Sequence, residues 1–368
     1  MMNQSELEQF WKNDEEAHRD NCFYKGHQVA LGIRMSHECV FAELGEEGTP
    51  WKPMPRDRQL ELNKRYNDKA EKIVGRRLLP ETMPEPDAMF PETKRIGEVF
   101  GGSYIYQHDT EWLTQSCEEP EELEALLDRV DKLNIREFML PNNWESEKKR
   151  IYETYGLRPR PLRHMRGPVT LACSIFGSEN LIFLGLDEPD LYRRFSETIG
   201  RVQMEMSRVM DEEAGVTPET RPGFSFADDN CCLLTPELYH DFGKPVLKKM
   251  FSYYSPNPND MRYQHSDSAM AHIIPELAEL DLNGVNFGPT VMVPEIRKYL
   301  PHARIDGVIA PFTFMRNEEE QLRKEVLRDI EYGFEYGGVN ITTAGSINNG
   351  SLLTSMRLIM ELIWENRR

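Results

Sequence analysis

The sequence lacks the features that mark several common classes of protein. Its 368 residues contain six cysteines, but no CxxC motif, and the one adjacent pair, Cys231 and Cys232, is poorly placed for a disulfide with itself. There is no signal peptide and no apolar run of about twenty residues. We therefore expect a soluble, cytoplasmic protein whose cysteines are reduced.

Positive charge is also scarce. The chain has 44 Lys and Arg residues against 62 Asp and Glu, for a formal net charge of −18. Such a field repels nucleic acid and anionic membranes, so we expect neither as a partner, although a local Arg or Lys can still bind a small anion. No GxGxxG follows a strand and no GxxxxGK[ST] occurs, so nothing supports a dinucleotide or P-loop site.

Strand-like and helix-like segments alternate from residue 160 onward. The predicted strands lie at 168–173, 224–227, 262–266, 282–287, 304–309 and 339–343, and the predicted helices at 189–210, 236–253, 271–280, 293–300, 318–332 and 352–365. Such alternation is typical of βα units in a parallel sheet. We favour an α/β fold of the (β/α)8 TIM barrel type, with an open doubly wound sheet as the alternative.

The first part of the chain has fewer strand signals. Residues 1–90 contain two polar helical stretches (2–20 and 58–77), a short strand at 28–34 and a proline-spaced loop from residue 79. The interpretation is an N-terminal helical and loop extension, residues 1–90, packed on a barrel formed by 91–368.

Polar side chains follow two of the predicted strands. Phe224-Ser225-Phe226-Ala227 leads into Asp228 and Asp229, and the next strand leads into His265 and Asp267. Parallel strands of a barrel deliver their carboxyl ends to the catalytic face. Because consecutive strand residues point to opposite sides, we expect Asp229 to face inward and Asp228 to cap a helix or pair at the rim. Asp229 and His265 are the candidate catalytic residues, and Asp267 contacts the ligand, orients His265 or caps the next helix.

Other polar residues are candidates for substrate binding. Asn286 ends a predicted strand, where its amide can bind a substrate or its own backbone. Asn340 and Thr342 share one face of the last strand by period-two alternation, and we expect them to line the pocket. Arg34 is either a carboxylate anchor or half of a surface ion pair.

The order of these segments resembles a known superfamily. Gly167-Pro168-Val169-Thr170-Leu171-Ala172, then Asp228-Asp229, then Thr235-Pro236-Glu237-Leu238-Tyr239, then the strand ending in His265, are similar to the uroporphyrinogen decarboxylase superfamily. The resemblance is strongest over 160–368. It implies a (β/α)8 barrel shared by the haem-pathway decarboxylase and by methyltransferases that act with corrinoid proteins, thiols, folates and methylated growth substrates.

Departures from the family pattern favour the methyltransferases. The decarboxylase begins with an Arg-rich segment, where this chain has Arg34 followed by Met35-Ser36-His37-Glu38. Thiol-directed methyltransferases hold zinc with a His-x-Cys pair and a late Cys, whereas this chain has His265-Ser266-Asp267 and no late Cys. The resemblance to ether-demethylating members implies a metal site with harder ligands, Asp229, His265 and Asp267. In those members a further ligand lies between the first acid and the histidine in the sequence, and this chain has Lys244 at that position. Folate-linked members work without zinc.

The predicted function is methyl transfer between a small methylated substrate or folate and a corrinoid (cobalamin) carried by a partner protein. Zinc is a possible metal, and tetrahydrofolate a possible acceptor. Two alternatives stay open: a decarboxylase acting on a porphyrinogen or another carboxylate-rich substrate, and a non-catalytic binding barrel.

Overall fold

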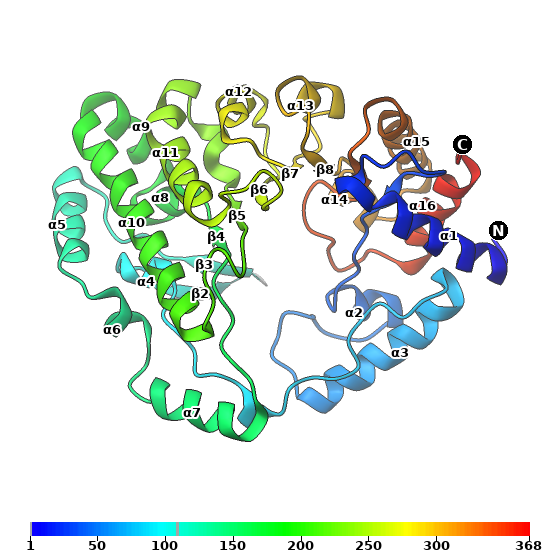
Figure 1. The fold of residues 1–368 in the computed structure, drawn as a ribbon, viewed down its shortest axis with the longest axis horizontal. Coiled ribbons are helices and arrows are strands. Elements are labelled where there is room, and N and C mark those ends of the chain that lie inside the picture. The colour runs from blue at the N-terminus through cyan, green and yellow to red at the C-terminus, as the bar shows by residue number, and fades with distance from the viewer. Residues whose placement is uncertain (1, 108–109) are drawn as a thin grey trace. The chain divides into compact units, whose positions relative to one another are not determined.

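A computed structural model describes residues 2–107 and 110–368 (Figure 1). The contact pattern divides the chain into two units, each assembled from separated segments. Unit 1 comprises Met1–Met83, Ser266–Ala271 and Asn283–Arg368, and unit 2 comprises Pro84–His265 and His272–Leu282. Each unit has its own parallel strands and covering helices, so each is described by itself.

Unit 1 brings the two ends of the chain together. Its parallel strands follow the order β1-β9-β8-β7, with Ala30 opposite Asn340, Ile305 opposite Val339 and Val285 opposite Ile305. Its helices are amphipathic, and α15 buries Leu322, Val326 and Ile330. The elements are α1 (Gln4–Ala17), the 3-10 turn η1 (Arg19–Cys22), β1 (Ala30–Leu31), α2 (Cys39–Leu44), α3 (Arg56–Val74), β7 (Gly284–Phe287), α13 (Val293–Tyr299), β8 (Arg304–Asp306), α14 (Pro311–Met315), α15 (Glu319–Tyr336), β9 (Val339–Ile341) and α16 (Leu353–Glu365).

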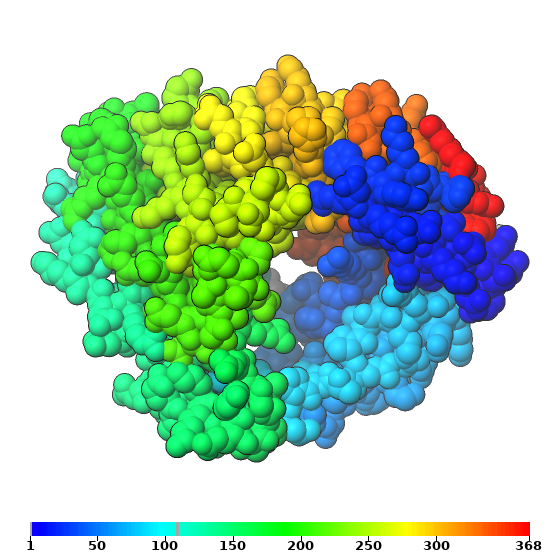
Figure 2. Space-filling model, in the orientation of Figure 1, coloured from blue at the N-terminus to red at the C-terminus, as the bar shows by residue number. Residues whose placement is uncertain are grey.

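Unit 2 contains the strands that carry the acid and histidine motifs. Its parallel strands β4, β5 and β6 are neighbours, and Arg166, Ala227 and His265 lie side by side in register. Figure 2 shows the atoms of this unit, mostly cyan and green, as a packed body. Its helical elements are η2 (Pro86–Ala88), α4 (Ile96–Val99), α5 (Pro120–Asp131), α6 (Ile135–Met139), α7 (Trp144–Tyr155), α8 (Pro168–Phe176), α9 (Ser178–Asp187), α10 (Pro189–Ala214), η3 (Asp229–Leu233), α11 (Pro236–Tyr254), η4 (Ala271–Ile273), α12 (Ile274–Leu277) and η5 (Ala278–Leu280). Its strands are the hairpin β2 (Tyr104–Gln107) and β3 (Thr110–Leu113), and β4 (His164–Arg166), β5 (Phe224–Ala227) and β6 (Arg262–Ser266).

One predicted strand is wrong. Residues 168–173 form the first turns of helix α8, and the strand is the preceding segment, His164–Arg166. Pro168 occupies the first helical position, where its missing N–H costs no hydrogen bond. The helix is buried on nearly every side, so its apolar run has no helical periodicity to distinguish it from a buried strand.

The other predicted elements are found with small shifts. The segment predicted as a helix at 271–280 is a chain of short turns, η4, α12 and η5, in which Pro275 follows the first helical residue of α12. The prediction that residues 1–90 form an extension stays a prediction. Within unit 1, however, β1 from that region pairs with β9 and so belongs to a parallel sheet.

In the described parts of the chain, no single helix has the length and apolar character needed to cross a bilayer. Only α8 and α9 taken together meet that test, and they are bent by 101° where they meet.

Candidate functional site

Asp228 is a buried cap of helix α8. Its side chain is fully buried, and its Oδ1 accepts a hydrogen bond of 2.7 Å from the backbone N–H of Thr170 in the first turn of that helix. Burial raises the pKa of Asp228 to about 6, although the hydrogen bonds from Thr170 act in the opposite direction. The structure thus places Asp228 in the capping position that the alternation of side chains predicted, while its role in substrate binding stays a prediction.

The turn before α8 is fitted closely around this carboxylate. The backbone N–H of Gly167 donates to the carbonyl of Ala227 over 2.6 Å, which holds the end of β4 against β5. A Cβ atom on Gly167 would lie 2.1 Å from the Cβ of Asp228. Only glycine fits at this position without a shift of the backbone.

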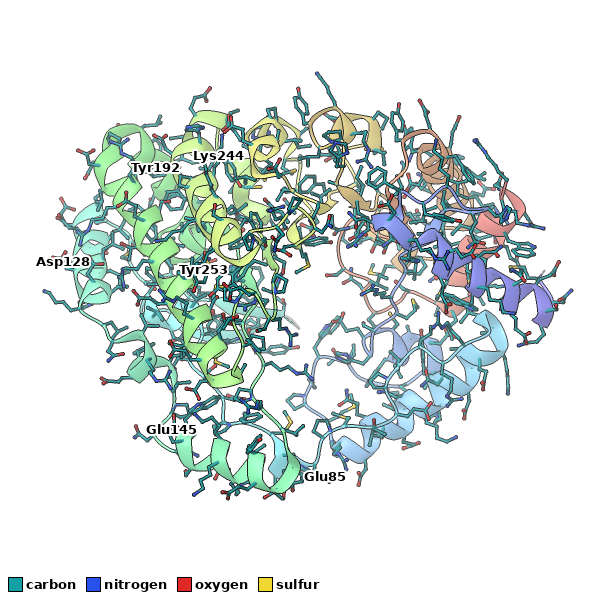
Figure 3. The ribbon with its side chains drawn as sticks, in the orientation of Figure 1. Glu85, Asp128, Glu145, Tyr192, Lys244 and Tyr253 are labelled. Carbon is teal, nitrogen blue, oxygen red and sulfur yellow. The ribbon has the colours of Figure 1, made fainter. Side chains whose placement is uncertain are left out.

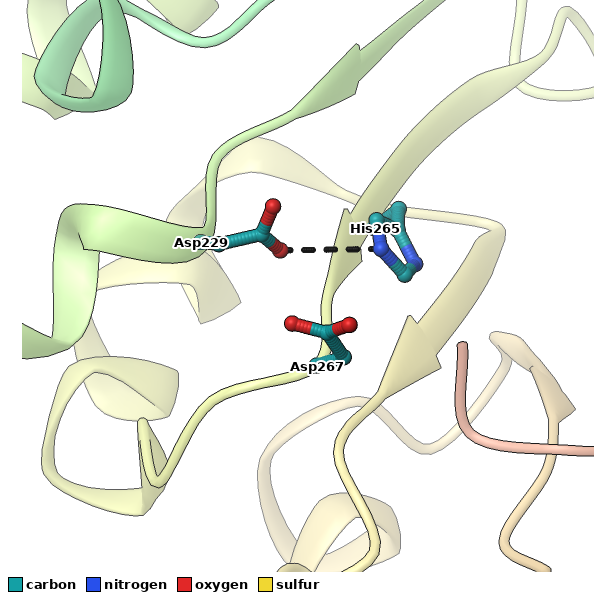
Figure 4. Close-up of side chains that lie close together, drawn as sticks. All are labelled: Asp229, His265 and Asp267. Atoms are coloured by element: carbon teal, nitrogen blue, oxygen red, sulfur yellow. Dashed lines mark ion pairs between the residues drawn. The ribbon is translucent and has the colours of Figure 1, made fainter. Parts of the chain in front are cut away.

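Asp229 and His265 form the acid and imidazole pair that the sequence predicted. The Oδ1 of Asp229 lies 3.5 Å from the Nε2 of His265, from adjacent strand ends (Figure 4). Their side chains are 39% and 23% exposed, so both can be reached by solvent or a ligand. A carboxylate and an imidazole at this distance are the side-chain types that most often serve together as a general acid and base.

Asp267 follows the end of β6, two residues beyond His265, so the chain itself keeps its carboxylate near the imidazole. One ligand atom from each of Asp229, His265 and Asp267 can be chosen so that all three lie within 4.8 Å of one another. Two carboxylate oxygens and an imidazole nitrogen are donors that zinc and harder divalent metals accept. The donor set therefore fits the metal that the resemblance implied.

A cavity of about 630 Å³ lies in unit 2 beside this pair. It is lined by the ends of β4 and β5, by α10, and by the segment before α4. Its apolar wall consists of Ile96, Met139, Leu162, Met165, Met206 and Met210. Its polar wall includes Lys94, Arg95, Arg160, His164, Arg166, Thr170 and Asp229. The cavity is of a size that holds a small organic ligand.

His164 and Arg166, both on β4, are site residues that the sequence reasoning missed. His164 Nδ1 lies 2.9 Å from the hydroxyl of Ser225, which itself donates to the carbonyl of Arg163 over 3.1 Å. The hydroxyl therefore accepts from Nδ1, and in the neutral ring Nε2 is an acceptor. Desolvation by the surrounding protein and the nearby His265 lower the pKa of His164, which keeps the ring neutral at pH 7.

The candidates from unit 1 have structural partners of their own. The side-chain amide of Asn286 donates to the carbonyl of Thr343 over 3.0 Å and to the carbonyl of Asp306. Asn340 is buried and donates to the Asp306 carboxylate over 2.8 Å. These bonds tie β7, β8 and β9 together. Thr342 is partly exposed and Arg34 is exposed, and the proposed binding roles of all four stay predictions.

Lys244 is held in an ion-pair cluster on α11. Figure 3 labels Lys244 on this helix. Its ammonium lies 3.0 Å from Glu276 and 2.8 Å from Glu279, and these contacts raise its pKa against the opposing effect of burial. A permanently charged ammonium is no metal ligand. The structure thus gives Lys244 a role in holding α11 to the segment 276–279.

Comparison with known proteins identifies the fold. A methyltransferase from Methanosarcina mazei has a similar structure, with a TM-score of 0.58 and 15% sequence identity over 96% of this chain and 97% of that chain. The chain is an α/β protein of the (β/α)8 barrel class, as predicted, with its acid and histidine at strand ends.

A family model matches part of the sequence. Residues 163–344 match the model described as Uroporphyrinogen decarboxylase (URO-D). The matched region includes β4, β5 and β6 with Asp229 and His265. No curated protein matches the sequence.

Proposed function

We propose that this protein is a methyltransferase, which moves a methyl group between a small methylated substrate or folate and a corrinoid (cobalamin) on a partner protein. The observation that carries the proposal is the Asp229–His265 pair beside a partly apolar cavity. The shared fold with a methyltransferase supports it, as does the family match.

The pair supplies the chemistry that a poor leaving group needs. When a methyl group leaves an oxygen or nitrogen, that atom keeps the bonding electrons and must be neutralised. His265, whose Nε2 lies 3.5 Å from the Asp229 carboxylate, donates a proton to that atom as the carbon–heteroatom bond breaks. The methyl carbon meanwhile forms its new bond to the acceptor.

The same residues fit a metal ion. Asp229, His265 and Asp267 would hold it, and a bound zinc ion supplies Lewis-acid stabilisation of a developing negative charge. Asp228 and Thr170 keep the β5 end in place in either case, because their hydrogen bond fixes the chain next to Asp229.

Anaerobic visible spectroscopy with methylcobalamin tests the proposal. We expect an enzyme-dependent loss of the methyl–cobalt spectrum in the presence of tetrahydrofolate or a thiol, and the active acceptor then defines the acceptor class. His265→Ala is expected to lower the rate by about 100-fold or more, as for loss of a general acid. His302→Ala, at an exposed histidine, is the matched control and is expected to leave the rate unchanged. Unchanged turnover in His265→Ala would refute the assigned role.

Decarboxylation is the second candidate, and the cations of the cavity favour it. Lys94, Arg95, Arg160 and Arg166 all line the wall next to Asp229, where they could hold a carboxylate-rich substrate. In this reaction the substrate loses carbon dioxide and the carbon left behind takes up a proton, while Asp229 stabilises a cationic ring. Release of labelled carbon dioxide from a carboxyl-labelled porphyrinogen, with no methyl transfer, would replace the first proposal by this one.

A further inference from the structure

The cavity of unit 2 contains a guanidinium that forms no ion pair with any residue that the structure describes. Arg166 ends β4 and lines the cavity, and no carboxylate of the described chain lies within salt-bridge distance of it. Its Nη2 donates to the hydroxyl of Ser174 over 3.0 Å, while its Nε is buried without a hydrogen-bond partner. In a chain with 62 acidic residues against 44 basic ones, an arginine left without an acid needs another source of negative charge.

The other cations of the cavity differ from Arg166. Lys94 pairs with Glu98 at 2.8 Å, and Arg95 pairs with Glu111 at 2.6 Å while its guanidinium lies over the ring of Tyr104. Arg160 is exposed at the edge of the cavity. Arg166 is thus the cation that combines partial burial, a place in the wall and no acidic partner in the described residues.

The other residues that line the cavity indicate the chemical character of the rest of the ligand. Four methionines, with Ile96 and Leu162, provide an apolar and adaptable surface. A ligand that fits both parts has an apolar body and one anionic group. A carboxylate matches a single guanidinium well, because two parallel N–H groups can bind its two oxygens.

We propose that this cavity binds a small carboxylic acid with an apolar body, and that Arg166 anchors the carboxylate. The proposal names the substrate class of the site and in that sense rests on the proposed function. The sequence suggested Arg34 as a carboxylate anchor. The present proposal assigns that role to Arg166 on β4 instead. His164 and Asp229 line the same cavity, and Asp229 lies 3.5 Å from His265, so the bound acid would lie beside the proposed proton-transfer pair.

Binding is measured by isothermal titration calorimetry without turnover, so failure of this proposal and failure of methyl transfer can be distinguished. The probe is 4-methoxybenzoate, which combines an apolar ring, a carboxylate and a methyl group on oxygen. Its neutral counterpart is 4-methoxybenzyl alcohol, and 4-methoxyphenyl phosphate tests a larger oxyanion. The native protein is expected to bind the carboxylate about 10- to 100-fold more tightly than the alcohol.

Arg166→Gln is expected to remove that preference, while leaving the weak binding of the alcohol unchanged. Arg166→Lys keeps the positive charge but lacks the planar guanidinium, and it is expected to show an intermediate preference for the carboxylate over the alcohol. This variant also tests the proposal if the Gln variant does not fold. Arg129→Gln, at an exposed arginine of α5 that bonds only to the carbonyl of Ala125, is the matched control. Equal binding of acid and alcohol by the native protein, or a preference that survives in Arg166→Gln, would overturn the proposal. Tighter binding of the phosphate would overturn the assignment to carboxylates.

Discussion

The Gly167–Asp228 contact predicts a large loss of stability from the addition of a single methyl group. Gly167 connects β4 to α8, and Asp228 directly follows β5 and caps that same helix. In Gly167→Ala the new Cβ would lie 2.1 Å from the Cβ of Asp228. Ordinary carbon contacts need about 3.5 Å or more, so the two strand ends must separate by more than 1 Å.

Two costs follow from that separation. Overpacking of a fitted site costs about 1–3 kcal/mol. The hydrogen bond of 2.7 Å from Thr170 to the buried Asp228 is also strained or lost, and a hydrogen bond to a charged group contributes about 1.5–3 kcal/mol. We expect Gly167→Ala to lower the free energy of unfolding by roughly 3–5 kcal/mol.

Urea denaturation followed by far-ultraviolet circular dichroism measures this change. Gly200→Ala is the control, because its Cβ on α10 would meet Val246 at an ordinary 3.4 Å, and the variant is expected to be more stable by about 0.5–1 kcal/mol. The double variant Gly167→Ala with Asp228→Gly keeps the new Cβ at position 167 but removes the Asp228 side chain that it would meet, and is expected to recover stability relative to Gly167→Ala alone. A Gly167→Ala protein as stable as the native one would refute this account of the turn.

Three further predictions concern charge and metal. Burial raises the pKa of Asp14 from 3.8 to about 6, so its contribution to stability is fully present below pH 3.8 and is lost as the pH rises through 6. Asp14→Asn should remove about 2 kcal/mol of the difference in unfolding free energy between urea titrations at pH 4.5 and 7.5. Lys244→Gln should lower the free energy of unfolding by about 1–2 kcal/mol, because Glu276 loses a close partner. The methyl-transfer rate should stay unchanged, and a loss of that rate would show that Lys244 belongs to the functional site. Metal analysis after anaerobic purification should find a divalent metal that Asp229→Ala and His265→Ala both lose, whereas metal retained by both variants would exclude these ligands.

Much of the fold was predictable because the second half of the chain has strong local signals. Helix α10 begins at Pro189 and ends before Gly215, which adopts a left-handed conformation, and its apolar stripe is continuous. Strands β5 and β6 are short runs with polar ends, and parallel pairing brings those ends together. Asp229 and His265 were predictable for that reason, because Asp229 follows β5 by two residues and His265 is the penultimate residue of β6.

The partners of the other candidates depend on contacts between distant segments. Asn286 and Asn340 share Asp306 as a partner, through its carbonyl and its carboxylate respectively, and no feature near either asparagine indicates this. The same holds for Lys244, whose acids come from a segment about thirty residues further along the chain. Spacing alone could not show these pairs, since each depends on which elements pack together.

Arg166 was not predicted as a site residue for a simpler reason. The apolar run at 168–173 predicts a strand that ends at Cys173, and this prediction leaves Arg166 in the preceding loop. Pro168 argues for the opposite choice, since proline is favoured at the first position of a helix and supplies no N–H to a sheet. If a helix begins at Pro168, the strand must end at Arg166, directly before Gly167. Parallel register then sets Arg166 level with Ala227 and His265. The arginine that has no acidic partner among the described residues therefore lies on the same edge of the sheet as the acid and the imidazole.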